Sequence, residues 1–321
     1  MYGAISDIIC GKKEIQMNEQ LIKNLQVPSG IVDAVLDTDT YNEIDDQFAL
    51  SYMLASPERI NTLAIYAAPF HNSRSTGPKD GMEKSYLEIQ TLLEKAGREE
   101  LKKVTFKGSE SYLPDEKTFV PSPAAQDLAE RAMNYTSEKP LYVVAIGAIT
   151  NVASAILINP EIVERIVIVW LGGHALEWPD TAEFNMLQDV PAARVVLGCG
   201  APVVMLPCMG VVDRFTITEP ELNYWFKGKS ALCDHLADAA IEEANSYAKG
   251  KPWSRVIWDV TAVAYLLNDN NRFMSAKMIP SPIPQMDNHY SVDPRRHPVM
   301  YVYAIHRDRL MTDLVEKLTK A

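Results

Sequence analysis

The fold is decided by residues 31–56, which read IVDAVLDTDTYNEIDDQFALSYMLAS. The first seven residues form an apolar, largely β-branched run, which is typical of a buried strand. Residues 44–56 have the spacing of a helix. The loop between the two segments is polar and acidic. A strand that passes through such a loop into a helix is the beginning of a βαβ unit.

The same alternation continues along the chain. We expect further strands at 60–68, 103–108, 140–147, 165–173 and 202–207, and helices at 81–97, 123–135, 149–159 and 190–198. Gly97 is expected to cap the first of these helices. Strands that alternate with helices indicate a mostly parallel sheet, and right-handed crossovers place helices on both of its faces. The sequence therefore predicts an α/β fold with a doubly wound sheet.

The pattern becomes mostly helical after about residue 216. We expect helices at 218–226, 231–248 and 258–267, a late strand at 299–306 and a closing helix from 307 onward. Five prolines between 280 and 298 indicate a surface loop or an edge hairpin. Because no linker-like stretch divides the chain, we expect an N-terminal extension at 1–30 and a single domain at 31–321 with a C-terminal helical elaboration.

The composition excludes several classes of protein. The 321 residues are 47% hydrophobic and 23% charged, which excludes disordered, collagen-like and coiled-coil chains. The formal net charge is −11, and an acidic surface repels phosphate backbones and anionic lipid. No apolar run reaches the roughly 20 residues of a membrane span. We therefore expect no nucleic-acid partner and no membrane association.

The cysteines and the N-terminal residues predict the compartment. Cys10, Cys199, Cys208 and Cys233 show no CxxC spacing, and a chain of this size needs no disulfides. The first 20 residues have no apolar stretch long enough for a signal peptide. Both observations favour reduced thiols and a cytoplasmic protein.

The acidic loop is the first candidate for a functional site. It holds Asp37, Asp39, Glu43, Asp45 and Asp46 at the carboxyl end of the predicted strand, where open parallel sheets bind ligands. Carboxylates this close repel one another unless a cation neutralises them, and oxygen ligands suit Ca²⁺ or Mg²⁺. The alternative is that the last two cap a helix N-terminus and the others are solvated surface charge, which leaves the clustering unexplained. The loop therefore predicts a metal site.

Three further loops are expected at the same edge of the sheet. Residues 146–151 carry a Thr-Asn pair that fits a helix cap. The alternative role for this loop is that one of its backbone carbonyls faces the metal. Residues 172–189 include Glu183 and Asn185, which would face the same way in an extended segment and suit hydroxyl recognition. Asp259 precedes an apolar helix, where an N-cap is the alternative to a ligand.

Four motifs in chain order resemble those of the calcium-dependent inosine–uridine nucleoside hydrolases. They are Asp-x-Asp followed by Asp-Asp within 37–46, Gly-Ala-Ile-Thr-Asn at 147–151, Gly-Gly…Ala-Glu-Phe-Asn…Asp at 172–189, and Trp-Asp-Val at 258–260. Any one motif is weak. Four in sequence, each at a predicted strand end or helix start, are specific, and the resemblance extends from about residue 31 to 270.

The resemblance implies a hydrolase that cleaves the N-glycosidic bond of ribonucleosides, or of a related ribosyl compound, to base and ribose. Its Ca²⁺ would be held by the side chains of Asp39, Asp46 and Asp259 and the backbone carbonyl of Ile146, with Asp37 supporting these ligands. Asp39 would also take a proton from the water bound to Ca²⁺. Family members act on small-molecule nucleosides in purine or pyrimidine salvage, and they are homodimers or homotetramers.

The substrate-binding half follows from the same resemblance. Ribose hydroxyls would contact Asp45, Glu183 and Asn185. The bond breaks through an oxocarbenium-like state at C1′, and nearby carboxylates with the amide oxygen of Asn185 would stabilise the developing positive charge. Asn185 is therefore a candidate catalytic residue as well as a substrate ligand.

This chain departs from the family pattern at three places. Residues 40–44 make the acidic loop two residues longer than usual, so that it must bulge. Glu177 stands where an Asn recognises the ribose. Trp258 replaces a His that can protonate the departing base, and an indole protonates nothing, although it can stack on the base. His71 or His174 is a candidate substitute acid and substrate contact.

The longer loop leaves its own residues without an assigned role. The bulge predicts that Asn42 or Glu43 enters the site. The sequence does not identify the base that is bound, nor the group that activates its departure.

Two other functions fit part of the pattern. A haloacid-dehalogenase-type phosphotransferase also places Asp-x-Asp after its first strand, but it requires Thr or Val where this chain has Tyr41, and its Lys followed by an acidic pair is missing. A catalytically altered protein of the same fold would still bind Ca²⁺ and ribose without turnover. An EF-hand does not fit, because the sixth loop position is Asn42 and not Gly.

Overall fold

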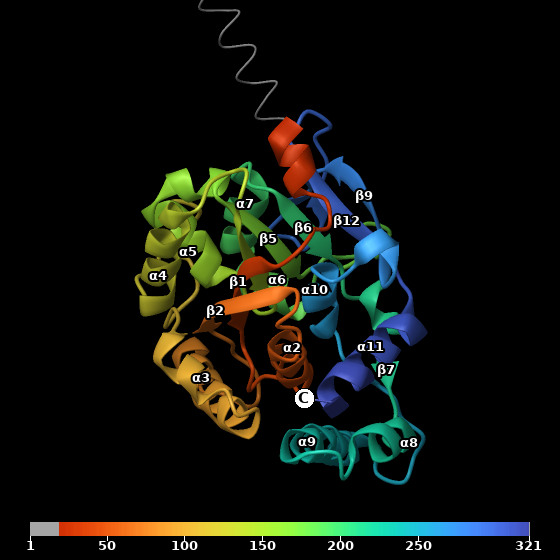
Figure 1. The fold of residues 1–321 in the computed structure, drawn as a ribbon. Helices are drawn as coiled ribbons and strands as arrows, with labels where there is room; N and C mark the ends of the chain where they lie inside the picture. Colours follow the sequence, from red (N-terminus) through yellow and green to blue (C-terminus); the bar gives the residue numbers. More distant parts are fainter. Residues whose placement is uncertain (1–18, 321) are drawn as a thin grey trace, which may run out of the picture.

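The computed structural model describes residues 19–320, and its centre is one eight-stranded sheet (Figure 1). The strand order is β3-β2-β1-β4-β5-β6-β12-β9. The strands are β1 (Val32–Thr38), β2 (Ile60–Ala67), β3 (Thr105–Lys107), β4 (Leu141–Ala145), β5 (Ile166–Leu171), β6 (Val203–Leu206), β9 (Met274–Pro280) and β12 (Pro298–Ile305). Neighbours from β3 to β12 pair in parallel, and only β9 is antiparallel, to β12. The predicted doubly wound, mostly parallel α/β fold is confirmed.

Helices cover both faces of the sheet, as predicted. They are α2 (Asp45–Leu54), α3 (Pro78–Lys95), α4 (Pro123–Arg131), α5 (Thr150–Ile158), α6 (Phe184–Gln188), α7 (Val190–Gly198), α8 (Glu219–Glu221), α9 (Ala231–Ala248), α10 (Val260–Tyr265) and α11 (Arg307–Lys320). Gly97 follows α3 with φ +64°, the left-handed conformation expected of a C-terminal glycine. The predicted helix at 218–226 is the short α8 continued by a π-helical turn, Leu222–Phe226.

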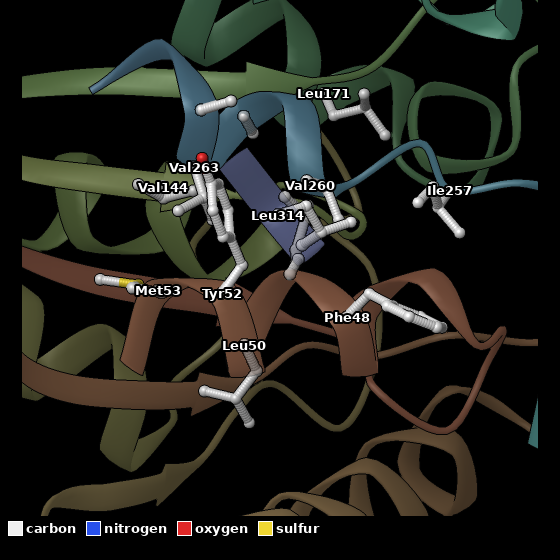
Figure 2. Packing of buried hydrophobic residues seen from close by; sticks show 14 of the residues in the cluster. Phe48, Leu50, Tyr52, Met53, Val144, Leu171, Ile257, Val260, Val263 and Leu314 are labelled. Atoms are coloured by element: carbon white, nitrogen blue, oxygen red, sulfur yellow. The ribbon is translucent and has the colours of Figure 1, made fainter. Parts of the chain in front are cut away.

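The core consists of two apolar layers, one on each face of the sheet. Successive residues of β1 alternate between them: Ala34 and Leu36 lie in the layer with α2, α10 and α11, and Val35 lies in the layer with α4, α5 and α7. In Figure 2 the side chains of Phe48 and Tyr52 on α2 and Val260 on α10 are grouped in the first layer. This packing holds the N-terminal ends of α2 and α10 beside each other.

The sequence analysis missed several strands of the C-terminal part, of which β9 is the longest. β9 is an edge strand whose middle residues, Lys277 and Met278, are exposed, so MSAKMIP lacks the buried run by which the inner strands are recognised. The proline-rich stretch forms the small hairpin β10 (Ile283–Pro284) and β11 (Tyr290–Ser291), which confirms the edge-hairpin alternative. A further pair joins β7 (Thr216–Ile217) to β8 (Arg255–Val256).

The predicted N-terminal extension lies partly outside the described residues, together with Cys10. Residues 19–24 are helical, and Leu25 is fully buried and accepts a hydrogen bond from the Tyr265 hydroxyl at 2.6 Å. Within residues 19–320, no helix has the length and apolar character needed to cross a membrane.

Candidate active site

A cleft opens where the loops after β1, β4, β5 and β6 meet the start of α10. Its polar lining is Asp39, Asn42, Glu43, Asp45, Asp46, His174, Glu183, Asn185, Trp258 and Asp259, with Ile146, Cys208 and Met209 beside them. The cavity volume is about 220 Å³, somewhat below the ~300–1,000 Å³ that is usual for sites of drug-sized ligands. Loops that are far apart in sequence therefore converge at the carboxyl edge, as expected for this sheet.

A cluster of buried carboxylates forms the floor of the cleft. Oxygens of Asp45, Asp46 and Asp259 lie within 4.8 Å of one another. Both carboxylate oxygens of Asp39 and Oδ1 of Asp45 are buried without a hydrogen-bond partner among the described residues. Asp46 accepts a 2.5 Å hydrogen bond from the Thr38 hydroxyl. Buried oxygens without donors are costly unless a cation binds them, so the donor set fits a divalent metal.

The electrostatics of the cluster support the same reading. Burial is the first cause that raises the pKa of Asp39, Asp45 and Asp259, and repulsion from neighbouring carboxylates, above all those of residues 43–46, raises each pKa further. Arg255 opposes the shift at Asp45. A bound divalent cation would reverse this balance, because it stabilises the charged form of every ligand.

Helix capping does not explain these aspartates. Ile44 is the N-cap of α2, and the side chains of Asp45 and Asp46 follow it inside the first turn. Asp259 is the N-cap of α10 by position, but its carboxylate makes no capping hydrogen bond. The capping alternatives stated from the sequence are therefore wrong for the carboxylates, which all point into the cluster instead.

Asp37 lies beneath the cluster and not in the lining of the cleft. Its Oδ1 accepts a 2.8 Å hydrogen bond from Asn151, whose own oxygen accepts from the backbone N–H and the hydroxyl of Ser109 at 2.8 and 2.9 Å. Burial raises the pKa of Asp37 to about 7. The Thr-Asn pair of 150–151 does not cap α5, whose N-cap is Ile149 without a side-chain bond. Asn151 instead ties the β1 end to the loop after β3.

Glu183 and Asn185 occupy the start of α6 rather than an extended segment, so the predicted local geometry is wrong, although both residues line the cleft. The Glu183 carboxylate accepts backbone N–H bonds from Gly173 (2.8 Å), Asn185 (2.9 Å) and Met186 (3.0 Å). Burial raises its pKa, and these donors oppose the rise. Both are held in place before any ligand binds.

The amide of Asn185 is oriented by the backbone around it. Its Nδ2 donates to the carbonyls of Ile146 (3.1 Å) and Leu171 (3.0 Å). Because both donors of the amide are used, the amide oxygen is the atom left for a ligand. The Ile146 carbonyl keeps a second lone pair for a metal.

The remaining predicted residues divide into two groups. Trp258 and the half-buried His174 line the cleft. Glu177 is exposed and lines a separate hollow with Lys277 and Tyr301, so the structure does not bring it to the ribose position expected for it. His71 is also exposed outside the cleft lining, and its ring nitrogen lies 3.4 Å from the Ser75 hydroxyl.

The bulged loop brings Asn42 and Glu43 to the cleft, as predicted. Glu43 accepts a 2.5 Å ion-pair hydrogen bond from Arg255, which lies 3.3 Å from Glu243 on α9. Glu243 is 3.2 Å from Arg74 in the loop after β2. Sequence reasoning missed this ion-pair network, because the partners of Glu43 are remote in sequence and follow no motif.

The chain is similar to a known protein family, to characterised relatives and to solved structures. Residues 34–297 match the family described as inosine-uridine preferring nucleoside hydrolase. The pyrimidine-specific ribonucleoside hydrolase RihA of Klebsiella pneumoniae is 37% identical over 159 residues, which cover 47% of this chain and 50% of that protein. RihA of Enterobacter sp. is 30% identical over 255 residues, covering 73% of this chain and 78% of the relative. Several of these matches thus span about half the length of the relative.

Solved structures with the same fold cover nearly the whole chain. A plant nucleoside hydrolase, PpNRh1, has a TM-score of 0.71 at 19% identity and covers 90% of this chain and 99% of its own. A purine-preferring ribonucleoside hydrolase from Gardnerella vaginalis has a TM-score of 0.71 at 20% identity, covering 90% and 98%. At these identities the likeness establishes the arrangement of the sheet and helices.

Proposed function

The chain belongs to the inosine-uridine preferring nucleoside hydrolase family, and from this premise we propose that it hydrolyses the N-glycosidic bond of ribonucleosides to base and ribose. The observation that carries the proposal is the set of buried, unpartnered carboxylate oxygens of Asp39 and Asp45 on the floor of the cleft. Such groups are costly for folding and are retained where a ligand uses them.

We propose Ca²⁺ as the cofactor, held by Asp39, Asp46, Asp259 and the Ile146 carbonyl, with Asp37 supporting the site from beneath. All of these ligand atoms are oxygens, which Ca²⁺ prefers. Carboxylate oxygens of Asp46 and Asp259 also lie within 4.8 Å of each other and of Asp45. When bound, the cation would supply positive charge that orients ribose hydroxyls and makes a neighbouring water more acidic.

Asp39 is the proposed general base. Its two oxygens are buried and free of donors, so they can accept the proton of the water that attacks C1′. In this step the water oxygen forms the new bond to C1′, the C1′–N bond breaks, and its electron pair leaves with the base, which takes up a proton from solvent. Asp39 holds the proton that the water loses, and ribose is released.

Charge complementarity explains the rest of the substrate site. Asp45 and Glu183 are acceptors for ribose hydroxyls. The oxygen of Asn185, fixed by the two bonds of its amide nitrogen, would face the positive charge that develops at the sugar. Trp258 lines the cleft and offers a face on which the departing base can stack.

The base preference is a separate part of the proposal. Because the curated relatives are named pyrimidine-specific, we propose uridine and cytidine as the first substrates. From the family resemblance we also propose a cytoplasmic homodimer or homotetramer that serves nucleoside salvage, and light scattering of the purified chain would measure its assembly.

The test is a reducing-sugar assay on a panel of pyrimidine, purine and nicotinamide ribosides. The protein is stripped with a chelator and assayed before and after Ca²⁺ is restored, beside the matched surface variant Asp287→Asn. Calcium-dependent sugar release by both proteins supports the proposal. Release that is unaffected by chelation refutes the metal assignment. No release from any riboside, with Ca²⁺ and ribose shown to bind, would establish the non-catalytic binding protein instead.

A further inference from the structure

The cleft carries an excess of negative charge. Six carboxylates line it, and no lysine or arginine is among the described residues of the lining. The carboxylates belong to Asp39, Glu43, Asp45, Asp46, Glu183 and Asp259. The proposed Ca²⁺ and the guanidinium of Arg255, which pairs with Glu43, together balance three of the six charges. The lining therefore attracts a ligand that is itself positively charged.

Glu43 brings this charge to the mouth of the cleft, on the side of Trp258. Its side chain is 38% exposed, whereas the aspartates of the floor are buried. Arg255 donates to Oε2 of Glu43 at 2.5 Å, and Oε1 has no hydrogen-bond partner among the described residues. Arg255 stands three residues before Trp258, and both Glu43 and Trp258 line the cleft. A fixed carboxylate oxygen and an indole ring therefore border the same part of the site.

A positively charged base suits these two side chains. The face of an indole attracts a cation, so a charged ring adds this attraction to ordinary stacking. The free Oε1 of Glu43 can accept a charge-assisted hydrogen bond from an N–H of such a ring. A neutral base gains only stacking and an ordinary hydrogen bond. Trp258 and Glu43 therefore discriminate between two bases of the same shape by their charge.

Among the described residues, the lining also lacks a strong acid for the departure of a neutral base. When the C1′–N bond of a neutral base breaks, the electron pair makes the base an anion that must take up a proton. His174 is the single histidine of the described lining, without a lysine or tyrosine beside it. The backbone N–H of Met209 lies 3.3 Å from its Nδ1, and burial lowers its pKa, so the ring is neutral. The carboxylates serve the metal and the ribose, and Trp258 cannot protonate a base.

We propose that the cleft takes ribosides whose base carries a positive charge, and that Glu43 and Trp258 determine this specificity. N-methylated nucleosides that are cationic at pH 7 are the chemical class. In the hydrolytic step the water oxygen bonds to C1′ and the C1′–N bond breaks. The electron pair of that bond cancels the charge of the base, which leaves neutral and needs no proton, and Asp39 holds the proton that the water loses. This inference rests on the proposed function and names the substrate class of the same site.

The test uses two ribosides that carry the same N3 methyl group, 3-methylcytidine, which is a cation at pH 7, and 3-methyluridine, which is neutral. Calorimetry measures the Kd of each for Ca²⁺-loaded Asp39→Asn, in which hydrolysis is expected to be slow, alone and combined with Glu43→Gln. We expect Asp39→Asn to bind the cation about 10-fold more tightly, and Glu43→Gln to reduce this ratio to about 2-fold, the loss of one partly exposed charge contact. The control Glu243→Gln weakens the same ion-pair network from outside the lining and should keep the ratio.

Equal binding of the two ribosides, or of neither, would overturn the inference. A ratio that Glu43→Gln leaves unchanged would do the same, because a loss shared by both ligands marks a residue that only supports the loop. Thermal denaturation of each variant separates such a loss from unfolding.

Turnover of the same two ribosides by the wild type is scored separately. Sugar release should be faster from 3-methylcytidine, and equal rates would contradict the inference. If the wild type releases no sugar from any riboside, the proposed function fails, and the two Kd values still decide whether the cleft selects a charged base.

Discussion

Removing the metal should destabilise the protein more at pH 8 than at pH 6. Burial and mutual repulsion raise the pKa of Asp39, Asp45 and Asp259, and burial raises that of Asp37 to about 7. The metal-free folded chain therefore holds protons that the unfolded chain has released above about pH 4. Where the native state binds more protons, stability falls as pH rises. Ca²⁺ takes the place of these protons, so the stability that it adds grows with pH.

The magnitude follows from the same groups. A pKa of about 7 against an ordinary 3.8 at Asp37 corresponds to roughly 4 kcal/mol by pH 8, an upper bound for one fully buried carboxyl. Ca²⁺ at about 100 times its Kd adds about 2.7 kcal/mol. For a chain of 321 residues, whose entropy of unfolding is about 0.7 kcal/mol/K, that corresponds to a rise in Tm of roughly 4 °C at pH 8. We expect less than about half of that rise at pH 6, where the ligands must first lose protons.

Differential scanning calorimetry measures this directly. The protein is compared in chelator and in saturating Ca²⁺ at both pH values, together with Asp259→Asn and the exposed control Asp287→Asn. Asp259→Asn should lose most of the calcium increment, and the control should keep it. An increment of equal size at pH 6 and pH 8, or one that survives in Asp259→Asn, would refute the reasoning.

Three further outcomes are expected. Arg255→Gln leaves Glu43 unpaired beside the cluster and should lower the free energy of unfolding by roughly 1–3 kcal/mol, because the ion pair is only partly buried. Arg255→Lys should recover part of that loss. Urea denaturation measures the free energy of unfolding of both variants. In Gly147→Ala the new Cβ would lie 3.0 Å from both Asp39 Oδ1 and the buried Ala68 Cβ, so kcat should fall by about 10-fold or more and Tm should fall as well; an unchanged kcat contradicts the assigned place of that carboxylate. Asn151→Leu removes the partner of two buried polar groups and should lower the free energy of unfolding by roughly 2–4 kcal/mol, a loss that the same denaturation curves would show.

The inner strands were predictable because burial leaves a continuous apolar run in the sequence. β5 reads IVIVWL and is buried along its whole length. β9 was missed because its exposed residues at an edge carry no such run, and its pairing with β12 is fixed by tertiary contacts. The helices were predicted to within a few residues where apolar spacing was regular, as at α9, but the π-helical turn after α8 has no pattern of its own.

The carboxylate cluster was predictable for a different reason. Strand ends in a parallel sheet meet at one edge, so the polar residues that follow β1 and begin α10 were expected together. The positions of Glu177 and Arg255 were not predictable, because Glu177 depends on how the loop after β5 bends and Arg255 is placed by the pairing of β8 with β7. The family resemblance placed Glu177 at the ribose, because it stands where the family pattern has an Asn. The loop turns its side chain outward instead. The bulge that carries Glu43 was predicted, but its ion pair with Arg255 was not, because the two residues are remote in sequence.

The most direct test of the central claim is the turnover rate of Asp39→Asn measured on protein whose calcium content is known. The assay uses the riboside that the wild type hydrolyses, saturating Ca²⁺, and a variant checked for native circular dichroism. We predict a fall in kcat of at least about 100-fold with Ca²⁺ still bound, because the amide cannot accept the proton of the attacking water. A calcium-loaded Asp39→Asn that keeps the full wild-type rate would show that Asp39 is not the base.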